Sequence, residues 1–181
     1  MLRNLFLASV LGLGSLGCGV VTIAGAGPAS ADGNTSATVT VVGGALSITV
    51  PANAGSLGSQ RNQVGGETIT GTLGQVQVND ARSAAAGSGW VATVISTAFT
   101  PLAGPAIAAG AVSYSAGAIA KVGTATYVDN DPTNLTGVGS AVTASGITGD
   151  NSATWNPTLT VAVPGGMAAG TYSATITHSV S

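Results

Sequence analysis

Charged side chains are scarce in this sequence. Its 181 residues include only 4 lysines and arginines and 6 aspartates and glutamates, which gives a formal net charge of -2. A soluble domain usually has about a quarter of its residues charged. A protein that binds nucleic acid needs a basic face to neutralise phosphates, so we exclude nucleic acid as a partner. With 45% hydrophobic residues, the chain is also too apolar to be a disordered tail.

Cysteine and histidine each occur once, as Cys18 and His178. Cys18 lies in the apolar N-terminal stretch, which excludes disulfides, thiol catalysis and cysteine metal sites from the rest of the chain. A lone histidine cannot build a histidine-rich metal site. We therefore predict no catalytic residue, no metal site and no cofactor.

The N-terminal residues have the pattern of a secretory signal peptide. One positive charge precedes an apolar stretch over residues 5–23, and small residues follow in an A-x-A pattern that ends at Ala31. This pattern predicts that residues 1–31 are removed by cleavage before Asp32. Residues 32–181 would then be one secreted or surface-held domain with no membrane segment. A retained N-terminal membrane anchor is the alternative.

Alternation of apolar and polar residues predicts β-strands along most of the remaining chain. It occurs over 37–41 and 46–50, and the two glycines between these runs predict a hairpin or a bulged strand. Further predicted strands are 67–73, 75–79, 89–99, 111–114, 125–128, 141–144, 158–163 and 171–180. Helix signals are nearly absent, because proline and glycine interrupt the alanine-rich segment 103–111.

Many short strands separated by turn residues predict an all-β fold, an antiparallel β-sandwich of the Ig-like or Greek-key type. The run 89–99 is apolar on both faces, so we place it at the centre of a sheet. His178 shares the alternation phase of Ile176 and Val180, which predicts that it packs inward as a neutral side chain. Asp80 and Arg82 are two residues apart, so they share a strand face and form an ion pair.

Three segments resemble the WxL-domain family of secreted Gram-positive surface proteins, in the divergent form found among actinobacteria. They are ATVTVVGGALSITVP at 37–51, VNDARSAAAGSGWVATV at 78–94 and AAGTYSATITHSV at 168–180. In the second segment, Asp80, Arg82 and Trp90 match the V-x-D-x-R...W-x-L block of the family. In the third, Tyr172 matches the tyrosine of the closing strand.

The sequence departs from the family pattern at three positions. Ala92 stands where the family has the leucine of its first W-x-L motif, while His178 and Val180 replace the tryptophan and leucine of the second. The resemblance implies a sandwich domain in which the family-motif residues have a structural role. These are Asp80, Arg82, Trp90, Tyr172, His178 and Val180.

The resemblance also implies a non-catalytic module that binds peptidoglycan, or another surface glycan, without a covalent bond. Candidate glycan contacts are Trp90, Trp155 and Tyr172, because aromatic rings stack on sugars. For Trp90 the flanking valines favour packing in the core, and for Trp155 packing on an edge strand is favoured over a glycan contact. Trp155 is flanked by asparagines and precedes Pro157, which favours its exposure over that of Trp90.

Two other functions fit the same residues. Low charge and long strand edges would allow copies of the chain to associate with one another, or with other surface proteins, by strand addition. A secreted glycan hydrolase would need two carboxylates, for which Asp80 and Asp131 are the candidates.

Overall fold

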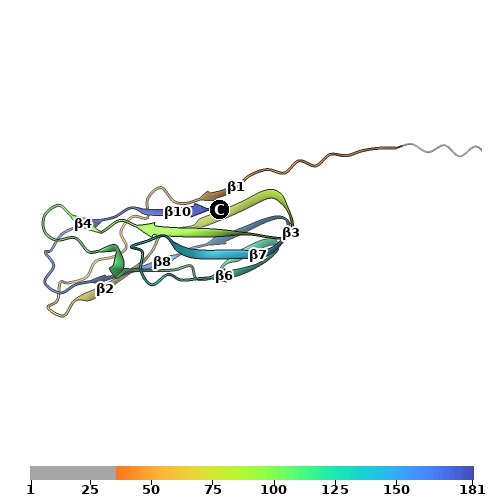
Figure 1. The fold of residues 1–181 in the computed structure, drawn as a ribbon. Helices are drawn as coiled ribbons and strands as arrows, with labels where there is room; N and C mark the ends of the chain where they lie inside the picture. Colours follow the sequence, from red (N-terminus) through yellow and green to blue (C-terminus); the bar gives the residue numbers. More distant parts are fainter. Residues whose placement is uncertain (1–35) are drawn as a thin grey trace, which may run out of the picture. The chain divides into compact units, whose positions relative to one another are not determined.

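The computed structural model describes residues 36–181, and the predicted signal peptide lies outside the described residues. Residues 40–181 form one compact unit; residues 36–39 belong to the unit that precedes it. Apart from a single turn of 3-10 helix, η1 (Ala109–Ala111), the regular structure of the described residues consists of β-strands (Figure 1).

The strands form two main antiparallel sheets and one small pair. In the larger sheet, which we call sheet A, the order is β1-β3-β7-β6, and β10 pairs with the same edge of β3 as β1. Sheet B has the order β2-β8-β5, and β4 pairs with β9. The bounds are β1 (Leu46–Thr49), β2 (Glu67–Thr72), β3 (Val76–Ser96), β4 (Thr100–Pro101), β5 (Val112–Ser115), β6 (Ala120–Asp129), β7 (Gly139–Trp155), β8 (Thr158–Val163), β9 (Tyr172–Ser173) and β10 (Ile176–Val180).

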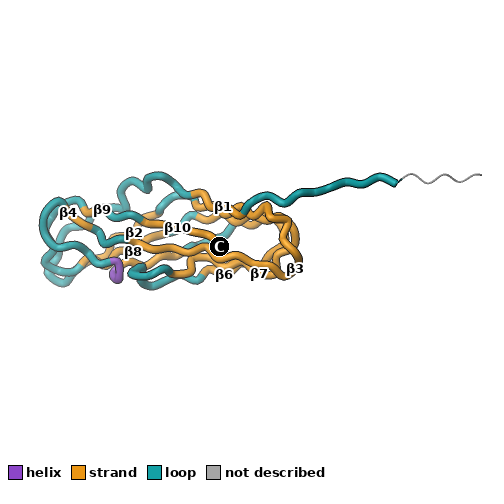
Figure 2. The backbone as a smooth tube through the Cα atoms, turned by 45° about the horizontal axis from the view of Figure 1, so that its top comes forward, coloured by secondary structure: helices purple, strands orange, loops and turns teal. Residues whose placement is uncertain are grey.

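One face of each sheet is buried against the other, because apolar residues recur at every second position. β8 shows this most clearly, with Leu159, Val161 and Val163 buried on one face. The largest buried side chains come from both sheets and from one loop: Trp90, Trp155, Tyr114, Leu135, Ile147, Leu159, Val76, Val78, Val94, Val112 and Val142. The predicted all-β, antiparallel sandwich is thus confirmed. Loops gather at the end that holds β4 and β9 (Figure 2).

Most predicted strands are present, and several are longer than predicted. The run 158–163 is β8. The run 67–73 is one residue longer than β2 at its end, and the run 111–114 is shifted by one residue from β5 at both ends. The runs 75–79 and 89–99 prove to be the two ends of the continuous strand β3, which lies between β7 and the β1–β10 edge of sheet A. The central position predicted for 89–99 is therefore correct.

The predicted strand over 37–41 is absent, and so is the hairpin that it would form with β1. Val39 and Val41 are 89% and 81% exposed and belong to no strand. The alternating pattern was misleading because it does not identify the partner strand with which residues 37–41 would pair. Gly44 still donates its N–H to the carbonyl of Ala81, but β3 is irregular between Asp80 and Ala84, so it offers no straight edge for residues before Gly44.

Strand β3 stays paired with β7 over its whole length because bulges absorb its curvature. Ser83 has a φ of 51°, and the Asp150 carboxylate accepts its backbone N–H at 2.9 Å. At Gly89, a β-carbon would lie 2.7 Å from the carbonyl oxygen of Ala144 on β7. Only glycine allows the two backbones to approach this closely.

We predict that Gly89→Ala destabilises the domain by about 1 to 3 kcal/mol, since β3 and β7 must separate to admit the methyl group. Gly137→Ala is the matched control, because no atom lies within 4 Å of the corresponding β-carbon. Urea unfolding monitored by tryptophan fluorescence measures both changes. Equal stability of the two variants would contradict the close approach at Gly89.

Candidate functional site

A fully buried carboxylate lies at the centre of sheet A. Asp80 has no exposed side-chain surface, and its partner Arg82 is 36% exposed. The guanidinium binds the carboxylate in a bidentate manner, Nε to Oδ1 at 2.8 Å and Nη2 to Oδ2 at 3.0 Å. The backbone N–H of Arg82 adds a bond to Oδ1 at 3.1 Å. The predicted ion pair is therefore confirmed.

Asn151 of β7 connects this carboxylate to two aromatic side chains. It faces Asp80 in the register, and its Nδ2 donates to Oδ2 of Asp80 at 3.1 Å. Its Oδ1 accepts the indole N–H of Trp90 at 3.0 Å and the hydroxyl of Tyr127 at 3.2 Å. We call the five residues Asp80, Arg82, Asn151, Trp90 and Tyr127 the Asp80 network. It joins β3, β7 and β6 through side chains as well as through backbone ladders.

The network is arranged to hold a negative charge. Hydrogen bonds from the Arg82 side chain keep the pKa of Asp80 below its usual 3.8, although burial acts in the opposite direction. Three motif residues of the family resemblance, Asp80, Arg82 and Trp90, thus meet in one place. Sequence analysis missed Asn151 and Tyr127, because nothing in the sequence places them beside a residue so distant along the chain.

A second chain of hydrogen bonds lies in the core. Trp155 donates its indole N–H to the hydroxyl oxygen of Tyr114 at 2.8 Å. The hydroxyl hydrogen of Tyr114 then remains for Nε2 of His178, 3.2 Å away. Burial lowers the pKa of His178 to about 4 and raises that of Tyr114, so both are neutral near pH 7. His178 packs inward on β10, as predicted.

Two of the three candidate glycan contacts are unsuited to that role. Trp90 and Trp155 are each only 2% exposed, so neither ring offers a face to a sugar. The prediction that Trp155 is more exposed than Trp90 is wrong, because the one polar atom of Trp155 finds a buried partner in Tyr114. The third candidate, Tyr172, is half-buried and donates its hydroxyl to the carbonyl of Ala168 at 2.8 Å. The remaining motif residue, Val180, is half-buried and pairs with Ala92.

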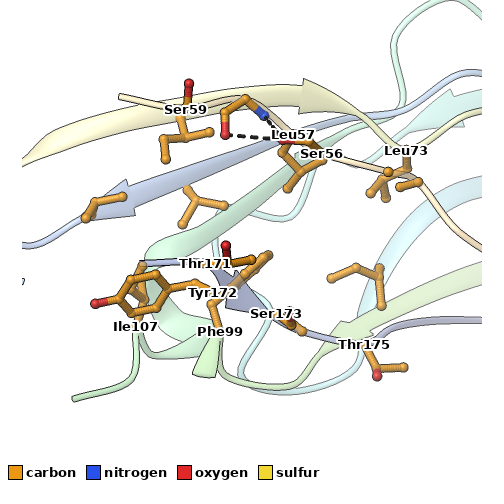
Figure 3. Close-up of a pocket in the computed structure, with 18 of the residues that line it drawn as sticks. Ser56, Leu57, Ser59, Leu73, Phe99, Ile107, Thr171, Tyr172, Ser173 and Thr175 are labelled. Carbon is orange, nitrogen blue, oxygen red and sulfur yellow. Dashed lines mark hydrogen bonds between the residues drawn. The ribbon is translucent and has the colours of Figure 1, made fainter. Parts of the chain in front are cut away.

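A cleft of about 820 Å³ opens between the two sheets. One side is formed by the loop 50–62 with β2, and the other by residues 167–178 (Figure 3). Its interior is apolar: Ile69, Leu73, Val76, Phe99, Ile107, Val161, Val163, Met167 and Ile176. Serine, threonine, asparagine and glutamine side chains line its rim. No lysine or arginine lines it, and Glu67 is its one carboxylate.

The outer face of sheet B carries a regular array of hydroxyl groups. Thr70 and Thr160 are cross-strand partners, and Thr160 also pairs with Ser113. The next row along the strands is Thr72, Thr158 and Ser115. We call these six residues the hydroxyl grid. All six are exposed or half-buried. In a β-sheet, the two rows are separated by about 7 Å along the strands, and neighbouring strands within a row are about 4.8 Å apart.

The two carboxylates considered for hydrolysis are already engaged. Asp80 is enclosed in its network, and Asp131 accepts the N–H of Ala116 at 2.8 Å and the hydroxyl of Ser115 at 3.0 Å. Within residues 36–181, no group of three histidine, cysteine or acidic side chains could hold a metal ion. No helix in this part of the chain is long and apolar enough to span a membrane.

Comparison of the chain with protein-family profiles, with curated proteins and with solved structures finds no match. Functional conclusions therefore depend on the geometry of the chain itself.

We predict that Arg82→Met destabilises the domain by about 3 to 5 kcal/mol, because it leaves the Asp80 carboxylate buried without its cation. Adding Asp80→Asn removes that charge and restores part of the loss. Arg61→Met, at an exposed arginine, is the control and changes stability little. Urea titrations of the four proteins test this. If the double variant is no more stable than Arg82→Met, the buried charge is not the cause.

We predict that stability falls as the pH drops from 6.5 to 4. Unfolded His178 binds a proton near pH 6.5, whereas the folded side chain resists it until about pH 4. The neutral form therefore contributes stability that is complete above pH 6.5 and is lost toward pH 4, roughly 2 kcal/mol after allowance for partial exposure. His178→Phe removes this dependence and costs about 1 kcal/mol at pH 7, because Tyr114 loses an acceptor. The free energy of unfolding of both proteins is measured across this pH range. If it falls equally in the parent and in His178→Phe, protonation of His178 is not the cause.

Proposed function

We propose that this chain is an exported, non-catalytic cell-surface module that binds a neutral wall glycan such as peptidoglycan without a covalent bond. The observation that carries the proposal is the hydroxyl grid on the outer face of sheet B. The resemblance to WxL domains supports the same function, and so does the Asp80 network, in which Asp80, Arg82 and Trp90 of the shared motif come together.

The grid suits a sugar polymer better than a charged ligand. Each hydroxyl both donates and accepts hydrogen bonds, as sugar hydroxyls and N-acetyl amides require of a partner. No charged residue lies within the two rows, although the Asp131 carboxylate at their edge accepts the hydroxyl of Ser115. Thr70 interacts with Thr160 at an oxygen–oxygen distance of 3.4 Å. The strands hold the hydroxyls at fixed spacings, so a repeating ligand can meet several of them at once.

The arrangement of carboxylates supports binding rather than hydrolysis. A glycosidase needs two carboxyl groups that flank the scissile bond, one of them able to donate a proton. Asp80 is inaccessible and bound to Arg82, which stabilises its ionised form. Asp131 holds a turn through Ser115 and Ala116. Neither group is free to act on a sugar.

We predict that Thr70→Val combined with Thr160→Val lowers retention on purified cell wall about tenfold, since two hydroxyls of about 0.5 to 1.5 kcal/mol each are lost. Valine keeps the shape and strand preference of threonine. Thr177→Val changes an exposed threonine on β10 of sheet A, and we expect it to bind like the parent protein.

A pull-down on purified wall, followed by release with salt or chaotrope, measures retention. Unchanged retention of the double variant, or equal loss in Thr177→Val, would place binding elsewhere. Release of new reducing ends from the wall by the parent protein would instead show a hydrolase.

A further inference from the structure

We propose that the cleft receives a β-strand from a second copy of the chain, formed by residues 37–42. This donor segment, Ala-Thr-Val-Thr-Val-Val, has the composition and alternation of a strand but belongs to none. Its three valines, Val39, Val41 and Val42, are 89%, 81% and 84% exposed. Exposed large apolar side chains clustered in this way mark an interaction site.

The cleft offers the two things that an added strand needs. Among the described strands, β2 pairs only with β8, and β10 pairs only with β3. Each strand therefore has one edge whose backbone N–H and C=O groups make no ladder, and residues of both strands line the cleft. An incoming strand gains backbone hydrogen bonds at such an edge and fills the pockets beside it with alternate side chains.

The side chains of the donor segment match the interior of the cleft. Alternation puts Ala37, Val39 and Val41 on one face, and Thr38, Thr40 and Val42 on the other. The first face suits the apolar interior, and the threonines suit the polar rim of the cleft. The segment carries no charge and no proline, so it brings no ion of its own into the cleft and lacks no backbone donor.

The loop over 50–66 leaves room for this exchange. It contains no strand or helix, and irregular loops longer than about 12 to 15 residues usually have a function. Most of its residues are exposed; Leu57 is half-buried and lies against Gly71 of β2. The amide of Asn62 binds the carbonyl of Met167 across the cleft. The ends of the loop are held, Pro51 against Gly74 and residues 64–66 against Gly165, so an incoming strand has to displace only the segment between them.

The point at which the donor segment is attached lies away from the cleft of the same chain. Gly44 is bonded to Ala81 of β3, and the Gly43 backbone packs against Arg82 so closely that a β-carbon would clash. From there β1 runs toward Val50, where the lining of the cleft begins. The donor segment thus joins β1 at the end away from the cleft. Because donor and acceptor are different surfaces, each copy can both give and receive a strand, and the copies join head to tail.

Engineered disulfides test the proposal directly, since residues 32–181 contain no cysteine. One protein carries Val41→Cys. The second carries Ser59→Cys or Thr175→Cys, exposed positions on opposite sides of the cleft (Figure 3). We expect mixed, oxidised samples to form disulfide-linked heterodimers. Thr126→Cys, on the exposed outer edge of β6, is the control and forms none.

Two outcomes would overturn the proposal: no heterodimer with either cleft position, or as much heterodimer with Thr126→Cys. A chain carrying Val41→Cys and Thr175→Cys together provides a further test. If it links only within itself, even in concentrated samples, the cleft takes the chain's own segment and the proposal is wrong.

Light scattering on the cysteine-free protein gives an independent readout. We expect Val39→Asp with Val41→Asp to weaken self-association at least about tenfold, because two carboxylates would enter the apolar cleft. Thr38→Asp with Thr40→Asp, which changes the opposite face, reduces it much less. All four side chains are exposed, so we expect folding to be unaffected. Equal effects of the two pairs would contradict the proposal that Val39 and Val41 face the interior of the cleft.

Discussion

The burial of the Asp80 carboxylate is the constraint on which sheet A depends. A carboxylate without solvent must be matched by donors, and here Arg82 and Asn151 supply them. Asn151 in turn holds Trp90 and Tyr127. A buried ion pair contributes little net stability, but removing one member is costly. The network therefore specifies one register of β3 against β7 and β6, because a shift by one residue would move Asp80 to the opposite face.

The irregularities of β3 have the same origin. Arg82 can return to Asp80 because the chain bulges after that residue, and Ser83 adopts its left-handed conformation with the Asp150 carboxylate as partner. Gly89, where the backbone of β7 leaves no room for a β-carbon, directly precedes Trp90. One long, bent strand thus carries a charged pair, a tight approach and the largest core side chain. The two surfaces proposed for binding lie elsewhere, on sheet B and in the cleft.

Sequence analysis predicted the parts of this protein that local pattern determines. Period-two alternation located β2, β5 and β8 and the inward phase of His178, because each strand has one buried face. It failed for residues 37–41, since alternation requires a partner strand that the pattern cannot identify. It failed for Trp155 because the hydrogen bond that permits burial comes from Tyr114, far along the chain. The hydroxyl grid depends on the register of three strands, and the cleft on their packing; neither is visible in one segment.

The pairing of β3 has a consequence for when the domain can fold. Its edge is completed by β1, which precedes it, and by β10, which follows every other strand in the chain. Pairing between segments so far apart makes folding slow, because the entropy of closing a long loop is lost before contacts form. A nascent chain therefore cannot close sheet A until its last strand has been synthesised. Such a delay keeps the polypeptide unfolded during synthesis, which is the state that passage through a translocation channel requires if the chain is exported as proposed.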